Sequence, residues 1–122
     1  MRARILVVDD HRNTRDALEL ALCIDACQVR TASNADEALA VVDSNEAFDL
    51  IACDIRMPGM SGIDLGAEIT RRRPDARIVM MTAHQVVGDE AERIQRLGIE
   101  VLIKPVTAAM LLTRCGKRSG GL

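Results

Sequence analysis

The chain has 122 residues, and 48% of them are apolar, which is enough for the core of one domain. Its net charge of −2 provides no general basic field, and the basic run 71–73 stands just before Pro74, as in the solvated last turn of a helix. Direct binding of nucleic acid is therefore not expected. The single aromatic residue, Phe48, argues against stacking on bases or on a flavin ring.

No apolar run approaches the roughly 18 residues that a membrane-spanning helix needs. Residues 1–4 lead directly into a strand pattern instead of a signal peptide, so we expect a cytoplasmic protein with no membrane contact. The cysteines have no C-x-x-C spacing and stand in apolar segments. We expect reduced, small hydrophobic side chains at all four: Cys23, Cys27, Cys53 and Cys115.

Short β-prone runs alternate with amphipathic segments along the chain. Strands are predicted at 4–8, 28–31, 50–53, 77–81 and 101–103. Helices are predicted at about 13–24, at 61–72 and at 107–114, and another begins at a capping box at Ser33. A further helix ends at about Leu97, with Val87, Ala91 and Ile94 on its inner face and Gly98 as its cap. This alternation predicts an α/β domain over residues 1–115, a doubly wound five-stranded parallel sheet with five helices, followed by a loose tail at 116–122.

Polar side chains follow four of the five predicted strands. Asp9 and Asp10 follow the first strand, Asp54 the third, Thr82 the fourth and Lys104 the fifth. Because the carboxyl ends of parallel strands meet at one edge of a sheet, where such folds bind ligands, we expect these side chains to lie on one rim.

This set of residue types suits phosphoryl transfer with a metal ion. Three adjacent carboxylates repel one another and favour a cation, and oxygen ligands favour a hard ion such as Mg²⁺. Lys104 supplies a mobile positive charge and Thr82 a hydroxyl donor for a phosphoryl oxygen, while Asp54 is a possible nucleophile. Taken alone, Asp9 and Asp10 could instead cap the first helix.

The same residues carry a resemblance to a known family. Asp9-Asp10, the run DIRMPGMSG at 54–62, Thr82-Ala83 and Lys104-Pro105 resemble the receiver domain of two-component response regulators, over residues 4 to about 114. The resemblance implies a flavodoxin-like fold with strand order 2-1-3-4-5. It also implies that residues 1–115 form a phosphoacceptor receiver, a switch and not a turnover enzyme.

By this resemblance, Asp54 accepts a phosphoryl group from a phosphohistidine of a sensor histidine kinase or a histidine phosphotransfer protein. Asp10, Asp54 and the backbone carbonyl of Arg56 would bind Mg²⁺ directly, with Asp9 acting mainly through water. Thr82 and Lys104 would bind the phosphoryl oxygens.

The chain departs from the family at the position three residues before the lysine, where receivers usually carry Tyr or Phe and this chain has Val101. Valine has no comparable inward and outward states, so we expect the output to run through backbone and helix shifts on the face formed by residues 86–114. Arg56 and His84 stand at positions that in the family flank the attacking water, and we expect them to tune the phosphoryl lifetime.

Other readings of the sequence stay open. A phosphatase-like hydrolase would normally need a second carboxylate at the position of Arg56, and an interaction module would use the fold without phosphorylation. His11 and His84 could form a transition-metal site.

The chain could act alone as a monomer or weak dimer on a protein target, or be an excised receiver of a larger regulator or hybrid kinase with an output domain. The apolar run 110–112 marks either a contact face or core packing.

Overall fold

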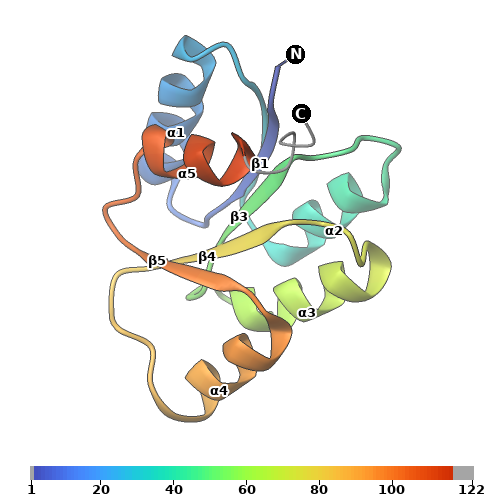
Figure 1. Ribbon diagram of the computed structural model, residues 1–122, viewed down its shortest axis with the longest axis vertical. Helices are drawn as coiled ribbons and strands as arrows, with labels where there is room; N and C mark the ends of the chain where they lie inside the picture. Colours follow the sequence, from blue (N-terminus) through green and yellow to red (C-terminus); the bar gives the residue numbers. More distant parts are fainter. Residues whose placement is uncertain (1, 117–122) are drawn as a thin grey trace.

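The sheet is built from five short parallel strands. In a computed structural model, which describes residues 2–116, these are β1 (Arg4–Val8), β2 (Gln28–Ala32), β3 (Leu50–Asp54), β4 (Ile78–Thr82) and β5 (Glu100–Ile103). Their spatial order is β2-β1-β3-β4-β5, and each neighbouring pair is parallel. The predicted sheet and strand order are confirmed (Figure 1).

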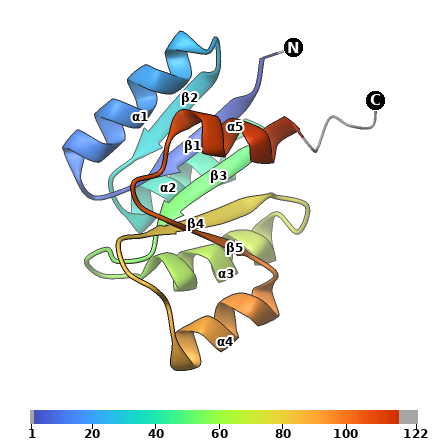
Figure 2. The same ribbon diagram turned by 60° about the vertical axis from the view of Figure 1, so that its left-hand side comes forward.

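Four helices connect the strands in the described part of the chain and a fifth follows the last strand: α1 (Arg12–Ile24), α2 (Ala35–Asp43), α3 (Gly62–Arg72), α4 (Gly88–Leu97) and α5 (Ala108–Gly116). Helices α1 and α5 cover one face of the sheet, and α2, α3 and α4 cover the other (Figures 1 and 2). The predicted tail at 116–122 lies outside the described residues, except for Gly116, where α5 ends.

The central strands explain the continuous apolar runs in the sequence. Every residue of β3 and β4 is buried, because helices cover both faces of the sheet there. Successive side chains of β3 point to opposite faces: Ile51 and Cys53 join the core under α2, α3 and α4, whereas Leu50 and Ala52 join the core under α1 and α5. Strand β2 lies at the edge, and its outer positions are exposed.

The structure agrees with two of the predicted helix caps and differs at a third cap and at one predicted inward residue. The Ser61 hydroxyl accepts a hydrogen bond from the Asp64 N–H, and Gly98 adopts φ of +69° at the end of α4, as predicted. The cap at Ser33 is wrong: α2 is capped by the neighbouring Asn34, whose side chain accepts from the Glu37 N–H. The inward position of Val87 is also wrong, because α4 begins one residue later and Val87 is 71% exposed.

Two local packing questions are settled by burial. All four cysteines are free; Cys27, Cys53 and Cys115 are buried and Cys23 is exposed. In the run 110–112, Leu111 is fully buried and its two neighbours pack partly against the same core, so packing explains this apolar run.

Among the described residues, no helix has the length and apolar character needed to cross a bilayer.

The four thiols should react in two classes. Burial raises the pKa of the Cys27 and Cys53 thiols, the latter most strongly, and it raises that of Cys115 to about 11, so thiolate is scarce and shielded at these sites. Brief treatment of the reduced native protein with iodoacetamide at about pH 8 should modify Cys23 alone, as read by intact mass and peptide mapping. Treatment in denaturant should modify all four, and rapid native labelling of Cys53 would contradict the packing described above.

Candidate functional site

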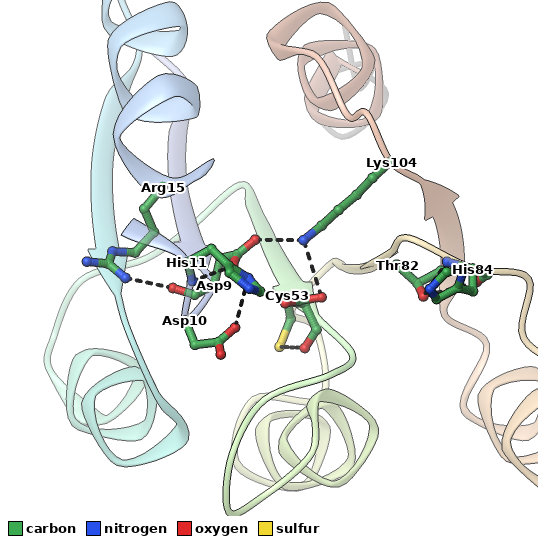
Figure 3. Close-up of polar contacts among 9 residues, drawn as sticks. Asp9, Asp10, His11, Arg15, Cys53, Thr82, His84 and Lys104 are labelled. Carbon is green, nitrogen blue, oxygen red and sulfur yellow. Dashed lines mark hydrogen bonds and ion pairs between the residues drawn. The ribbon is translucent and has the colours of Figure 1, made fainter. Parts of the chain in front are cut away.

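Side chains from three strand ends meet at the carboxyl edge of the sheet. Asp9 follows β1, Asp54 is the last residue of β3, and Lys104 follows β5. The Lys104 ammonium Nζ lies 3.1 Å from Asp9 Oδ2 and 3.5 Å from Asp54 Oδ1 (Figure 3). Both carboxylates are buried, with Asp54 3% exposed. One cation therefore balances two buried carboxylates that come from positions 45 residues apart in the sequence.

Asp9 is tied into the fold by several hydrogen bonds. Its Oδ1 accepts from the His11 N–H at 2.8 Å, and its backbone carbonyl accepts from Arg15 Nη1 at 2.9 Å. Asp10 is different: its Oδ1 is buried and accepts no hydrogen bond, with only the His11 ring Nδ1 at 3.3 Å. The N-cap of α1 is His11, which makes no side-chain capping bond. Neither carboxylate is needed as the cap of α1.

The environment raises the pKa of Asp54 above its ordinary value. Burial is the largest cause, and the neighbouring charge of Asp9 adds to it. The ammonium of Lys104 opposes the rise, as does a hydrogen bond from the Arg56 backbone N–H, while Asp10 contributes further repulsion. The carboxylate of Asp54 is thus held in a setting where its negative charge is only partly compensated.

The carboxylate cluster fits a hard divalent cation. One ligand atom from each of Asp9, Asp10, His11 and Asp54 lies within 4.8 Å of the others. Most of these atoms are carboxylate oxygens, the donors that Mg²⁺ prefers, and a cation would also satisfy the buried Asp10 Oδ1. Among the described residues this cluster includes His11 but not His84, so the two histidines are not brought together as a transition-metal site.

Thr82 lies at the same edge, but its hydroxyl is engaged within its own turn. Its Oγ1 donates to the His84 carbonyl at 3.0 Å and accepts from the His84 N–H at 3.2 Å. In Figure 3 both residues lie to one side of the group formed by Asp9, Asp10 and Lys104. Thr82 is 1% exposed, so this turn occupies a hydroxyl that would otherwise be buried without a partner.

The Arg56 side chain extends toward α4. Its guanidinium forms a two-point ion pair with Glu90, at 2.8 and 2.9 Å, and this contact holds the pKa of Glu90 below its usual range. The sequence prediction missed this partner, since the two residues are separated by 34 positions and Glu90 alone looks like an ordinary acidic residue in the first turn of a helix. A second ion pair, between Arg93 and Asp64, joins α4 to α3 itself.

A close backbone approach places α3 directly behind Asp54. The Gly62 N–H donates to the Ile55 carbonyl at 2.9 Å, and a Cβ at Gly62 would stand 2.1 Å from the Asp54 carbonyl oxygen. Only glycine fits there without movement of the main chain. Gly59, in the loop before, has φ of +77° and open space around it. The loop after Asp54 therefore depends on these two glycines for different reasons.

Comparison with known proteins gives one consistent family. The family model for the response regulator receiver domain matches residues 5–115. The chain is 33% identical over 121 residues to the response regulator protein FleR of Pseudomonas aeruginosa, covering 99% of this chain and 25% of FleR. It is 36% identical over 104 residues to the DNA-binding transcriptional regulator NtrC of Salmonella typhimurium, covering 85% of this chain and 22% of NtrC. The chain thus spans about a quarter of the length of these relatives.

Solved structures agree with the fold along nearly the whole chain. A CheY-like response regulator receiver domain protein from Methanospirillum hungatei superposes with a TM-score of 0.87 at 28% identity, covering 99% of this chain and 96% of that one. A response regulator receiver protein from Pseudomonas putida gives a TM-score of 0.85 at 32% identity, covering 96% of this chain and 98% of that one. The same fold therefore accounts for nearly the whole of both solved chains.

Substitution of the two loop glycines should separate steric clash from backbone strain. Gly62→Ala forces a Cβ against the main chain at Asp54 and should destabilise the protein by about 3 kcal/mol, the upper range for overpacking. Gly59→Ala meets no atoms and should cost only about 1 kcal/mol, from its left-handed conformation. Urea unfolding followed by circular dichroism measures both, and equal effects would contradict the close approach.

Replacement of the buried carboxylate should stabilise the metal-free fold. Because the folded pKa of Asp54 is raised, ionisation costs stability, and this cost is absent below the unfolded pKa of about 3.9 and complete once the pH exceeds the folded pKa. In EDTA near neutral pH, Asp54→Asn should therefore raise the melting temperature by several degrees, with the gain fading toward about pH 3.5. The same exchange at exposed Asp16 should have little effect at either pH.

Proposed function

The chain belongs to the response regulator receiver domain family, and we propose that it is the phosphoacceptor switch of a two-component phosphorelay, with Asp54 as the phosphorylated residue. The observation that carries the proposal is the contact of Lys104 with buried Asp9 and Asp54 at the carboxyl edge of the sheet. A nucleophilic carboxylate beside a mobile ammonium and a carboxylate cluster suits transfer of a dianionic group.

In the proposed reaction, an Asp54 oxygen attacks the phosphorus of a phosphohistidine in a sensor histidine kinase or histidine phosphotransfer protein. The new bond joins phosphorus to the carboxylate oxygen, the phosphorus–nitrogen bond breaks, and its electron pair returns to the imidazole nitrogen. Lys104 stands within reach of Asp54 and would follow the negative charge onto a phosphoryl oxygen. The raised pKa of Asp54 indicates that negative charge at the site is not fully balanced, so an added cation would stabilise the carboxylate.

Mg²⁺ would be held by Asp10, Asp54 and the backbone carbonyl of Arg56, with Asp9 acting through water. When bound, the ion would neutralise negative charge on the carboxylates and the phosphoryl oxygens. The buried Asp10 Oδ1 that accepts no hydrogen bond supports this assignment. His11 already places its ring beside both carboxylates that follow β1.

Thr82 supplies the first step of the proposed readout. To donate to a phosphoryl oxygen, its hydroxyl must give up the His84 carbonyl, which opens the turn at the start of the loop that leads to α4. We place the output on the face formed by residues 86–114. Val101 is half-buried against the core on that face, so helix displacement replaces rotation of an aromatic ring. His84, which is exposed beside Thr82, tunes the phosphoryl lifetime.

The site favours a switch over a turnover enzyme. A phosphatase of this type would place a carboxylic acid two residues after its nucleophile, where this chain has Arg56 paired with Glu90. The long relatives include transcriptional regulators, so an output domain or a separate protein target receives the signal, in the cytoplasm where phosphorelays act. The chain itself acts as a monomer or weak dimer.

Incubation with Mg²⁺ and phosphoramidate, followed by intact mass measurement, tests the chemistry. One phosphoryl group should add to the unaltered chain, and none to Asp54→Asn, because the amide is not a nucleophile. EDTA should abolish the adduct, and Lys104→Met should reduce it at least about tenfold, since that cation touches the acceptor. An unaltered chain that takes up no phosphoryl group would instead support an interaction module that works without phosphorylation.

A further inference from the structure

The Arg56–Glu90 ion pair joins the loop after the phosphoacceptor to the first turn of α4. Arg56 follows Asp54 by two residues, and its backbone N–H hydrogen-bonds the Asp54 carboxylate. The main chain of Arg56 therefore lies beside Asp54, while its side chain reaches away to Glu90 at 2.8 and 2.9 Å. Rotation of the Arg56 side chain would give this guanidinium another partner.

We propose that Glu90 is a positioning residue that holds the Arg56 guanidinium away from Asp54, and that a phosphoryl group on Asp54 competes with Glu90 for it. This inference rests on the proposed phosphorylation of Asp54. It assigns Glu90, a residue of α4, a role in setting the phosphoryl lifetime. It also makes the position of α4 sensitive to phosphorylation.

The chemistry of the guanidinium allows this exchange. Its planar set of N–H donors matches a carboxylate and a phosphoryl group equally well, and it keeps its charge in either place. The two side chains of the pair are 57% and 41% exposed, so water screens their attraction and the contact is weak. Phosphorylation adds negative charge and three acceptor oxygens to Asp54, next to the Arg56 backbone.

The exchange has a kinetic consequence. In hydrolysis of the aspartyl phosphate, a water oxygen bonds to phosphorus and the bond from phosphorus to the Asp54 oxygen breaks. The carboxylate is regenerated, inorganic phosphate leaves, and one proton passes to solvent. A guanidinium on the phosphoryl oxygens occupies the space through which water approaches. Arg56 therefore prolongs the lifetime, and Glu90 shortens it by holding Arg56 back.

The exchange also has a mechanical consequence for α4. Two ion pairs join α4 to the α3 side of the molecule, Arg56–Glu90 and Arg93–Asp64. Only the first involves a residue next to the phosphoacceptor. Its loss on phosphorylation would free the N-terminal turn of α4, whereas Arg93–Asp64 includes no residue of the loop after Asp54 and provides a matched control.

The test measures the decay of the phosphoryl adduct by intact mass after removal of the phosphodonor. Glu90→Gln should lengthen the lifetime several-fold, because Arg56 is released toward the phosphoryl group. Glu90→Asp, which keeps a carboxylate, should return the lifetime toward that of the unaltered chain. Asp64→Asn, which breaks the control ion pair, should leave it unchanged, and circular dichroism should show all three variants folded.

The double variant Arg56→Gln/Glu90→Gln decides whether Glu90 acts through Arg56. It should decay at the rate of Arg56→Gln alone, with no lengthening. A lifetime that Glu90→Gln leaves unaltered, or a lengthening that persists in the double variant, would overturn this inference while the adduct still supports phosphorylation. Absence of any adduct on the unaltered chain would overturn the proposed function and this inference with it.

Discussion

The burial of the Asp54 carboxylate at the centre of the sheet edge is the constraint on which the site depends. Its side chain has almost no exposure to water, and a second buried carboxylate, Asp9, stands nearby. Lys104 contacts both, so one ammonium stabilises two charges that burial and mutual repulsion disfavour. Because the compensation is incomplete, the pKa of Asp54 stays raised. The ionisation of Asp54 is therefore sensitive to any charge that is added nearby.

The sheet supplies the geometry that this balance requires. The Lys104 N–H donates to the Thr82 carbonyl at 2.7 Å and the Ile55 N–H to the Met81 carbonyl at 3.0 Å, so the exits of β3, β4 and β5 are held in register by backbone hydrogen bonds. Gly62 then allows the start of α3 to pack against the main chain of Asp54. Asp54 therefore sits on rigid elements, and the side chains around it are the parts that can rearrange.

The sequence predicts those features that a periodic pattern or a strand end determines. Asp54 and Lys104 could be placed together because each stands at the carboxyl end of a strand of a parallel sheet, whose strand ends share one edge. Glu90 could not be assigned to Arg56, since a contact between side chains 34 residues apart leaves no periodic signal. The shift of a helix cap from Ser33 to Asn34 has a similar cause, because either side chain can cap and only the local backbone decides.

Helix α4 is the element best suited to carry a change away from this site. Ile94 is its only buried residue, so few apolar contacts hold its position against the sheet. One polar connection from the site, Arg56–Glu90, reaches its first turn, and a second, between Thr82 and His84, lies in the loop that leads to it. The Thr82 hydroxyl and the Arg56 guanidinium are hydrogen-bond donors that a phosphoryl oxygen would attract, whereas the neighbouring Val101 offers only apolar packing. With a valine there, the coupling that we propose between Asp54 and α4 would depend on these polar contacts and would be electrostatic in origin.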